Sequence, residues 1–138
     1  MRPFIIGVYN AKIAFICVHN SCRSQIAEAL GNKILAGRYE CYSAGTEIKD
    51  SINEDAVRVL KELYNIDMVS NKQYSKLIDS IPKCDIYVSM GCNVSCPNIE
   101  GGFTYNWGLV DPTGESDDVF IKVIKEIEIN LNDLLVNN

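Results

Sequence analysis

Short apolar runs alternate along the chain with segments whose apolar residues recur every three or four positions. Residues 12–18 read Lys-Ile-Ala-Phe-Ile-Cys-Val, a run typical of a buried parallel strand. Similar runs at residues 39–44, 85–90 and 103–107 predict three further strands. Residues 4–8 are expected to add an edge strand.

Helical spacing and helix-end signals predict four helices between and after these strands. Ser24 is expected to cap the first, which runs to about Ala36. Asn53 is expected to cap the second, and Pro82 to stop a short third helix over residues 75–80. The apolar faces are expected to be Ile26, Ala29, Leu30, Ile34 and Leu35 in the first helix, Ala56, Leu60 and Leu63 in the second, and Phe120, Val123, Ile124, Ile127, Leu131 and Leu134 in a final helix over residues 117–136.

The resulting order, β-α-β-α-α-β-β-α, predicts an α/β fold of three layers, α/β/α, in which helices cover both faces of a parallel sheet. The length of 138 residues suits one domain, residues 1–138. Ligands of such sheets bind beyond the carboxyl ends of the strands, so functional residues are expected there.

Composition narrows the class of protein. The net charge of -5 argues against a nucleic-acid partner, because nucleic-acid binding needs a basic face. No apolar run approaches the roughly 20 residues of a membrane span, and residues 1–10 are too short and polar for a secretory signal. We therefore expect a cytoplasmic, monomeric protein with no membrane partner. In that compartment its six cysteines indicate redox chemistry or metal binding rather than a disulfide framework.

The segment after the first strand has the residues of an oxyanion-binding loop, residues 17–23. Such a strand-to-helix turn can aim several backbone N–H groups at one point, and Arg23 can hold two oxygens of an anion. The same field favours the nucleophilic thiolate of Cys17, to which Ser24 can donate a hydrogen bond. Asn20 suits a left-handed position within the loop. Besides Arg23, the residues expected to surround the oxyanion are Val18, His19, Asn20, Ser21 and Cys22.

The loop also has a simpler interpretation, in which Cys17 is a buried core residue and Arg23 a surface charge. For Cys22 a packed or backup thiol is favoured over an attacking role. His19, the one histidine, is assigned no catalytic role.

A second pair of cysteines, Cys92 and Cys96, follows the third strand and starts at the same sheet edge as Cys17. The Gly, Asn, Ser and Pro residues among them indicate an irregular segment. Two thiols on such a segment can act in sequence, one attacking a Cys17 adduct and the other resolving the disulfide that forms. The alternatives are ordinary free thiols or a zinc site, which usually needs four ligands.

These motifs resemble the low-molecular-weight protein tyrosine phosphatase fold, and most of all the thioredoxin-coupled arsenate reductases built on it. The resemblance covers about residues 12–130. Its landmarks are residues 17–25, Ala27-Glu28-Ala29, Ser43-Ala44-Gly45-Thr46, Leu77-Ile78-Asp79, Cys92 with Cys96-Pro97, and Trp107 with Asp111-Pro112.

The resemblance implies a four-stranded parallel sheet, attack by Cys17 on the oxyanion, and Asp111 as proton donor. Cys92 and Cys96 would then be the second and third cysteines of a redox relay that a thioredoxin-like protein returns to thiols. Some relatives place more than three residues between these two cysteines. Without the resemblance, Asp111 would be read as a turn residue before proline.

A bound potassium ion in some relatives implies a further site in this chain, although no cofactor is required. The matching positions are Asn20, Glu28, Ser43 and Asp67, each of which could otherwise be a cap or a solvated polar group.

The sequence leaves three functions open. The first is reduction of arsenate to arsenite through Cys17, Cys92 and Cys96. The second is hydrolysis of phosphomonoesters, which needs neither Cys92 nor Cys96. Phosphatases of this fold carry paired tyrosines after the Asp-Pro, where this chain has Thr113-Gly114-Glu115, so this second hypothesis is disfavoured. The third is an oxyanion-binding or redox-sensing module without turnover.

Overall fold

A computed structural model of the chain describes residues 11–91 and 99–137. The edge strand expected at residues 4–8, as well as Cys92 and Cys96, lies outside these ranges. The elements are β1 (Ala11–Cys17), α1 (Arg23–Ile34), β2 (Tyr39–Gly45), α2 (Glu54–Tyr64), the 3-10 helix η1 (Ile78–Ser80), β3 (Ile86–Ser89), β4 (Tyr105–Asn106) and α3 (Asp117–Asn137).

The strands form one four-stranded parallel sheet with the order β2-β1-β3-β4. Cys17 ends β1 opposite Gly45 of β2, and Ile16 lies opposite Ser89 of β3. The carboxyl ends of three neighbouring strands therefore meet at one sheet edge. The fold class predicted from the alternation of apolar runs is confirmed.

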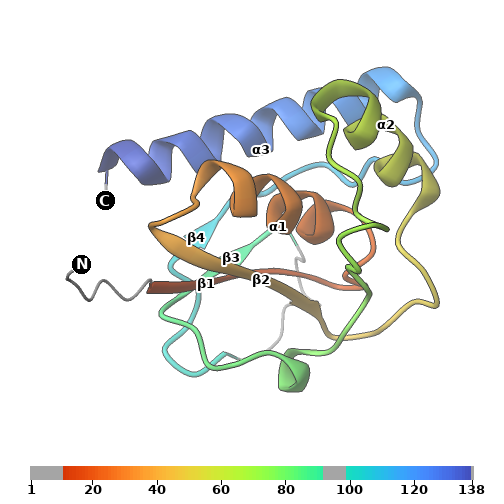
Figure 1. The fold of residues 1–138 in the computed structure, drawn as a ribbon. Helices are drawn as coiled ribbons and strands as arrows, with labels where there is room; N and C mark the ends of the chain where they lie inside the picture. The colour runs from red at the N-terminus through yellow and green to blue at the C-terminus, as the bar shows by residue number, and fades with distance from the viewer. Residues whose placement is uncertain (1–10, 92–98, 138) are drawn as a thin grey trace.

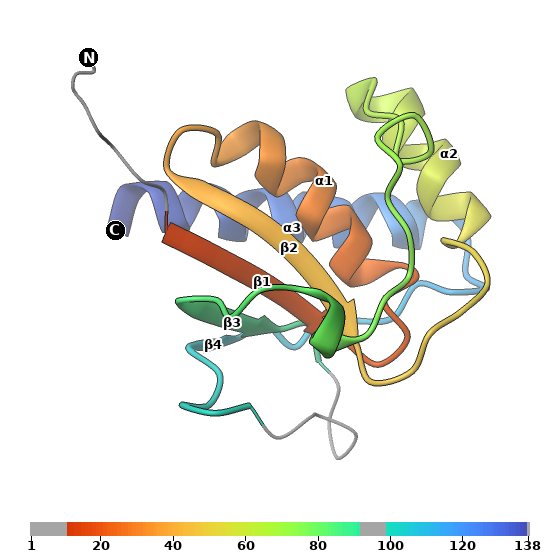
Figure 2. The same ribbon diagram turned by 60° about the horizontal axis from the view of Figure 1, so that its bottom comes forward.

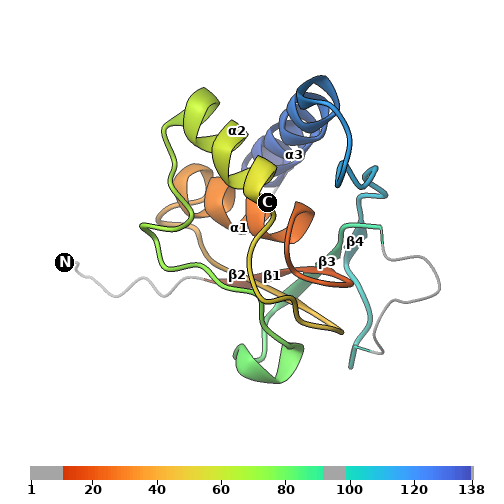
Figure 3. The same ribbon diagram turned by 90° about the vertical axis from the view of Figure 1, so that its right-hand side faces the viewer.

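β1 is buried on both of its faces. Ile13, Phe15 and Cys17 point into the larger core, which contains residues of all three α-helices, whereas Ala14 and Ile16 point into a smaller core on the other side. This alternation follows from the two-residue repeat of a strand. Figures 1 and 3 show α1, α2 and α3 over one face of the sheet and η1 beyond the other.

The layer on the second face is thinner than predicted. Instead of a helix over residues 75–80, only η1 is helical, because the chain before it pairs with β2. The amide of Gly45 donates to the carbonyl of Lys76 (2.9 Å), and Leu77 forms a parallel bridge with Gly45. Figure 2 shows η1 beside the end of β2.

The expectation that Ser24 caps α1 is wrong. α1 begins at Arg23 with Cys22 as its N-cap, and no side chain caps it. Ser24 is therefore inside the first turn, where its side chain is buried and hydrogen-bonded within the loop that precedes the helix. The Ser24 hydroxyl thus contacts Cys17 instead of capping the helix.

The cap of α2 is confirmed, since the Asn53 side chain accepts from the amide of Ala56 (3.0 Å). The predicted apolar face is only partly correct. Ala56 and Leu60 are buried, but Leu63 is 45% exposed and Val59 is buried in its place. Leu63 shares the helical spacing of this face, but it lies in the last turn of α2, one residue before the helix ends at Tyr64, and remains partly exposed.

The predicted apolar face of α3 is confirmed, because all six of its named residues are buried. Asp117 and Asp118 stand in its first turn, where the helix dipole favours negative charge. Asp117 also pairs with Arg58 of α2 (2.7 Å), which joins the two helices at the surface. Across the described ranges, no helix combines the length and apolarity needed to cross a membrane.

The two leucines of α2 provide a matched test of this packing. Leu60→Ala should lower the free energy of unfolding by about 2–5 kcal/mol, because it removes buried methyl groups and leaves a cavity. Leu63→Ala should change it by less than about 0.5 kcal/mol, as is usual at an exposed position. Urea denaturation of both variants would show this, and equal losses would mean that α2 is rotated relative to the structure.

Candidate active site

The segment between β1 and α1 lines a cavity of about 270 Å³ at the carboxyl edge of the sheet. The cavity brings together most of the residues expected to act on an oxyanion. It also includes Lys49 and Thr113, which the sequence patterns did not single out as site residues. The lining residues are Cys17, Val18, His19, Ser21, Cys22, Arg23, Lys49, Asp111 and Thr113.

The carbonyl groups of residues 18–22 in this loop all accept hydrogen bonds from groups outside it. Val18 accepts from the amides of Thr46 and Glu47 (both 2.9 Å) and Ser21 from the amide of Asn53 (2.8 Å). The three remaining bonds are Ser75 Oγ to the carbonyl of His19, Gln25 Nε2 to that of Asn20, and the Ile26 amide to that of Cys22.

This outward set of bonds fixes the direction of the loop amides. A trans peptide group holds its N–H opposite to its C=O, so carbonyls turned outward leave the following amides turned inward. In the part of the chain that the structure describes, the amides of residues 19–23 have no protein acceptor. Together with the N-terminus of α1 they form a nest of donors suited to a tetrahedral anion.

Cys17 lies at the base of this nest, with its sulfur 2.8 Å from Ser24 Oγ. Ser24 Oγ in turn accepts from Asn20 Nδ2 (2.8 Å). Because that bond already uses the oxygen as an acceptor, the serine hydrogen is free to donate to Cys17. Such a bond stabilises a thiolate. Asn20 has φ 51°, as expected for a left-handed position.

Arg23 is nearly buried beside the same cavity, with 8% of its surface exposed. Its Nη1 donates to the carbonyls of Leu109 (2.8 Å), Met90 (3.2 Å) and Gly91 (3.4 Å). Among the described residues no partner uses Nε or Nη2, so one edge of the guanidinium remains for an anion. The alternative that Arg23 is a surface charge is therefore wrong.

Cys22 is a buried thiol whose environment opposes ionisation. Burial, reinforced by the negative charge of Asp111 and by Cys17, raises the pKa of Cys22 to about 12, against a smaller opposing effect of Arg23. A thiol with this pKa stays protonated near neutral pH and is a poor nucleophile. The structure thus supports a packed role for Cys22.

Asp111 is a carboxylate held by its neighbour Thr113. Burial acts to raise the pKa of Asp111, but it is outweighed by hydrogen bonds from the Thr113 hydroxyl (2.7 Å) and amide (3.1 Å) and by the charges of Arg23 and His19. The net effect is a pKa below the ordinary value. Asp111 is therefore ionised in the free protein near neutral pH.

The residues expected to hold potassium do not form one site. Glu28 and Ser43 are hydrogen-bonded to each other (2.6 Å), and Asn20 belongs to the adjoining loop network. Asp67 instead accepts from the amides of Val69 and Ser70 and pairs with Lys61 (3.5 Å). The ammonium of Lys76 lies 3.3 Å from Glu28 Oε1. This set does not fit a bound cation, because a lysine already supplies the positive charge.

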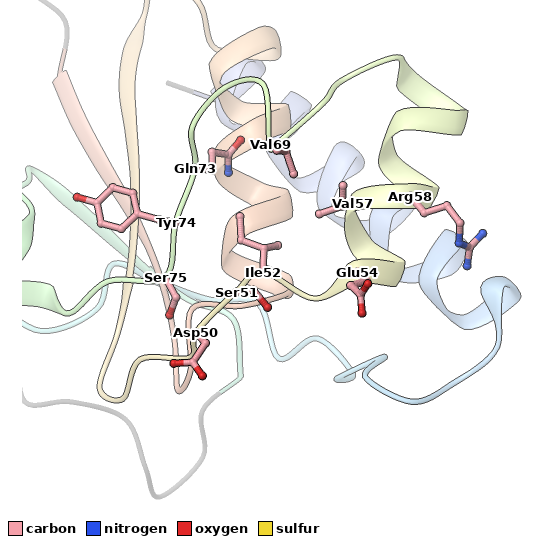
Figure 4. Close-up of a pocket in the computed structure, with 10 residues that line it drawn as sticks. All are labelled: Asp50, Ser51, Ile52, Glu54, Val57, Arg58, Val69, Gln73, Tyr74 and Ser75. Carbon is pink, nitrogen blue, oxygen red and sulfur yellow. The ribbon is translucent and has the colours of Figure 1, made fainter.

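A larger cavity, about 590 Å³, adjoins the site between the segment after β2 and the segment after α2. Figure 4 shows Asp50, Ser51 and Ile52 on one side of it and Gln73 to Ser75 on another. None of the described residues that line it is a cysteine, so we assign the thiol chemistry to the smaller cavity.

Comparisons with known proteins agree with this geometry. Residues 12–137 match the family described as low molecular weight phosphotyrosine protein phosphatase. An arsenate reductase of Staphylococcus xylosus is 35% identical over 85% of this chain and 90% of its own length. The solved structure of an arsenate reductase in the phosphate binding state has a TM-score of 0.79 and 30% identity, covering 92% of this chain and 98% of that one. A thioredoxin-dependent arsenate reductase of Corynebacterium glutamicum has a TM-score of 0.74 and 28% identity, covering 98% of this chain and 65% of that one.

The free edge of Arg23 predicts a specific loss on substitution. Arg23→Lys should weaken the binding of inorganic phosphate by about tenfold or more, since a charged hydrogen bond contributes about 1.5–3 kcal/mol and an ammonium cannot make the two-pronged contact. Arg38→Lys, at an exposed position in the turn between α1 and β2, is the matched control. Isothermal titration calorimetry should separate the two variants, and equal affinities would exclude Arg23 from the anion site.

Proposed function

The chain belongs to the low molecular weight phosphotyrosine protein phosphatase family, and from that premise we propose that it is an arsenate reductase with Cys17 as nucleophile. The observation that carries the assignment of Cys17 as nucleophile is the contact of its Sγ with Ser24 Oγ (2.8 Å), at the base of the nest of loop amides that have no acceptor among the described residues. Support comes also from the arsenate reductases that match most of the chain.

In the first step the Cys17 thiolate attacks arsenic, a sulfur–arsenic bond forms, and one arsenic–oxygen bond breaks. Arg23 and the loop amides hold the remaining oxygens. The departing oxygen needs a proton, for which Asp111 is the candidate donor. Asp111 is ionised in the free protein. The negative charge of a bound oxyanion in the same cavity raises its proton affinity, so it gains its proton on binding.

In the second step Cys92 gives up its proton and attacks the sulfur of Cys17 as a thiolate. A disulfide forms, the electron pair of the sulfur–arsenic bond passes to arsenic, and arsenic(V) leaves as arsenic(III) in arsenite. Cys96 then attacks Cys92 and releases Cys17, so that two thiols have supplied two electrons. Cys92 directly follows Gly91, whose carbonyl accepts from Arg23 (3.4 Å), and this connection supports its place in the relay.

An external dithiol is needed to reduce the Cys92–Cys96 disulfide after each turnover. A thioredoxin-like protein is the proposed partner, in line with the thioredoxin-dependent relative of similar fold. Such a cycle needs a reducing compartment, so the proposal places the protein in the cytoplasm, as a monomer without a resident cofactor.

The phosphatase reaction would use the same loop, with water hydrolysing a phosphorylated Cys17. It is less favoured because Thr113 occupies the side of the cavity next to Asp111 and no tyrosine follows the Asp-Pro. Oxyanion binding alone would leave the paired thiols without a function. A redox-sensing module would use them without turnover, so turnover of arsenate distinguishes it from the proposed enzyme.

Serine variants of the two relay cysteines test the proposal. Cys92→Ser should stop arsenite release, and Cys96→Ser should allow about one turnover and trap a Cys17–Cys92 disulfide, because its resolving thiol is absent. Cys84→Ser is the matched control, since Cys84 is buried before β3 and its sulfur donates to the carbonyl of Pro82 (3.3 Å). Peptide mapping under non-reducing conditions would identify the trapped disulfide. Multiple turnovers by the Cys92→Ser, Cys96→Ser double variant would contradict the relay.

A further inference from the structure

Lys76 carries a buried ammonium group directly behind the oxyanion loop. The residue is 9% exposed, and its Nζ has three oxygen acceptors. These are Glu28 Oε1 (3.3 Å), the carbonyl of Tyr74 (3.3 Å) and Ser43 Oγ (3.5 Å). An ammonium has three hydrogens, so each has an acceptor. These distances are long for hydrogen bonds, so the positive charge of the ammonium contributes more to the interaction than the geometry of the individual hydrogen bonds.

The acceptors around Nζ are those that a monovalent cation would take. They comprise a carboxylate, a hydroxyl and a carbonyl, and the Tyr74 ring lies 5.0 Å from Nζ. Glu28 and Ser43 are two of the residues expected to hold potassium. A second positive charge beside Nζ would be repelled at this distance in a poorly solvated position.

The backbone of Lys76 connects this ion pair to the nucleophile. Its amide donates to Asn20 Oδ1 (3.0 Å), which also accepts from Gln25 Nε2 (2.9 Å). Because an amide N–H can only donate, Oδ1 must face Lys76, and Nδ2 must face Ser24. The bond from Asn20 Nδ2 to Ser24 Oγ thus follows from the position of Lys76, and the contact of Ser24 with Cys17 follows from that bond.

We propose that Lys76 is a positioning residue whose ammonium serves as a built-in cation, in place of a bound potassium ion, and holds the Asn20–Ser24–Cys17 network in its binding geometry. Glu28 is largely buried and needs a countercharge, since breaking a buried pair leaves an uncompensated charge. Because the Lys76 ammonium is covalently attached to the chain, it supplies this countercharge whatever salts the solution contains. The oxyanion loop of this protein is therefore formed without potassium.

The proposal predicts how two properties, the melting temperature and the affinity for inorganic phosphate, respond to potassium. Both are measured without turnover, so a failure here is distinguishable from a failure of the proposed reaction. The wild-type protein should give the same values in potassium chloride and in N-methylglucamine chloride of equal ionic strength. Stabilisation of the wild type by potassium in a saturable manner would overturn the proposal.

Variants of Lys76 test whether its ammonium stands in place of a potassium ion. Lys76→Met keeps the length of the side chain but removes the charge, and it should lower the melting temperature by roughly 10 °C and weaken phosphate binding in both salts. Lys76→Asp completes an all-oxygen set, and potassium should raise its melting temperature and restore phosphate affinity, whereas N-methylglucamine should not. Lys83→Met, at an 80% exposed lysine, is the control that should match the wild type.

Two results would contradict the role of Lys76. If Lys76→Met binds phosphate as tightly as Lys83→Met, the ammonium does not position the loop. If Lys76→Asp gains nothing from potassium, the ammonium does not stand where a cation would bind. Should Lys76→Met fail to fold, the wild-type comparison and the Lys76→Asp titration still decide the matter.

Discussion

The oxyanion loop has to turn five consecutive amides toward one point, and it can do so only if the intervening carbonyls are satisfied elsewhere. Buried carbonyls without partners would cost free energy comparable to a lost hydrogen bond each. Here the partners come from three directions: the segment after β2, the segment before η1 and the first turn of α1. The parallel order β2-β1-β3 brings these segments to one edge, which is how the fold prepares the site.

Buried charged side chains also hold the site in place. Arg23 binds the carbonyls at the end of β3 and before Asp111, while Glu28 and Lys76 form an ion pair behind the loop. Both groups depend on close partners, because isolated charges are strongly disfavoured in the interior. Cys17 therefore lies between Arg23, whose free edge faces the anion site, and the Asn20–Ser24 hydrogen bonds, which Lys76 orients. Burial keeps the neighbouring thiol of Cys22 neutral by raising its pKa.

The sequence patterns predict the sheet, the long helices and the loop because each depends on local spacing. Cys17 and Arg23 stand six positions apart at a strand-to-helix turn, and Asn20 sits where a left-handed residue is needed. Contacts made across the fold were missed or misassigned. Leu63 fits a helical face by spacing, but the position of α3 decides which face is buried. Lys76 would be taken for a surface lysine from the sequence alone, and it is the pairing of Lys76 and Leu77 with Gly45 that buries it. For Ser24 the predicted contact with Cys17 is confirmed, but the predicted cap is not, because α1 begins one residue earlier, at Arg23.

In the proposed reaction arsenate is reduced at Cys17, and the two electrons come from the thiols of Cys92 and Cys96. Counting the thiols that remain after the reaction tests this most directly. The fully reduced protein would be mixed with excess arsenate, without any external reductant, and assayed for arsenite and for remaining thiols. The account predicts one arsenite and the loss of two thiols per protein molecule, with phosphomonoester hydrolysis by the same preparation much weaker. Efficient hydrolysis of a phosphomonoester with no arsenite and no loss of thiols would contradict it.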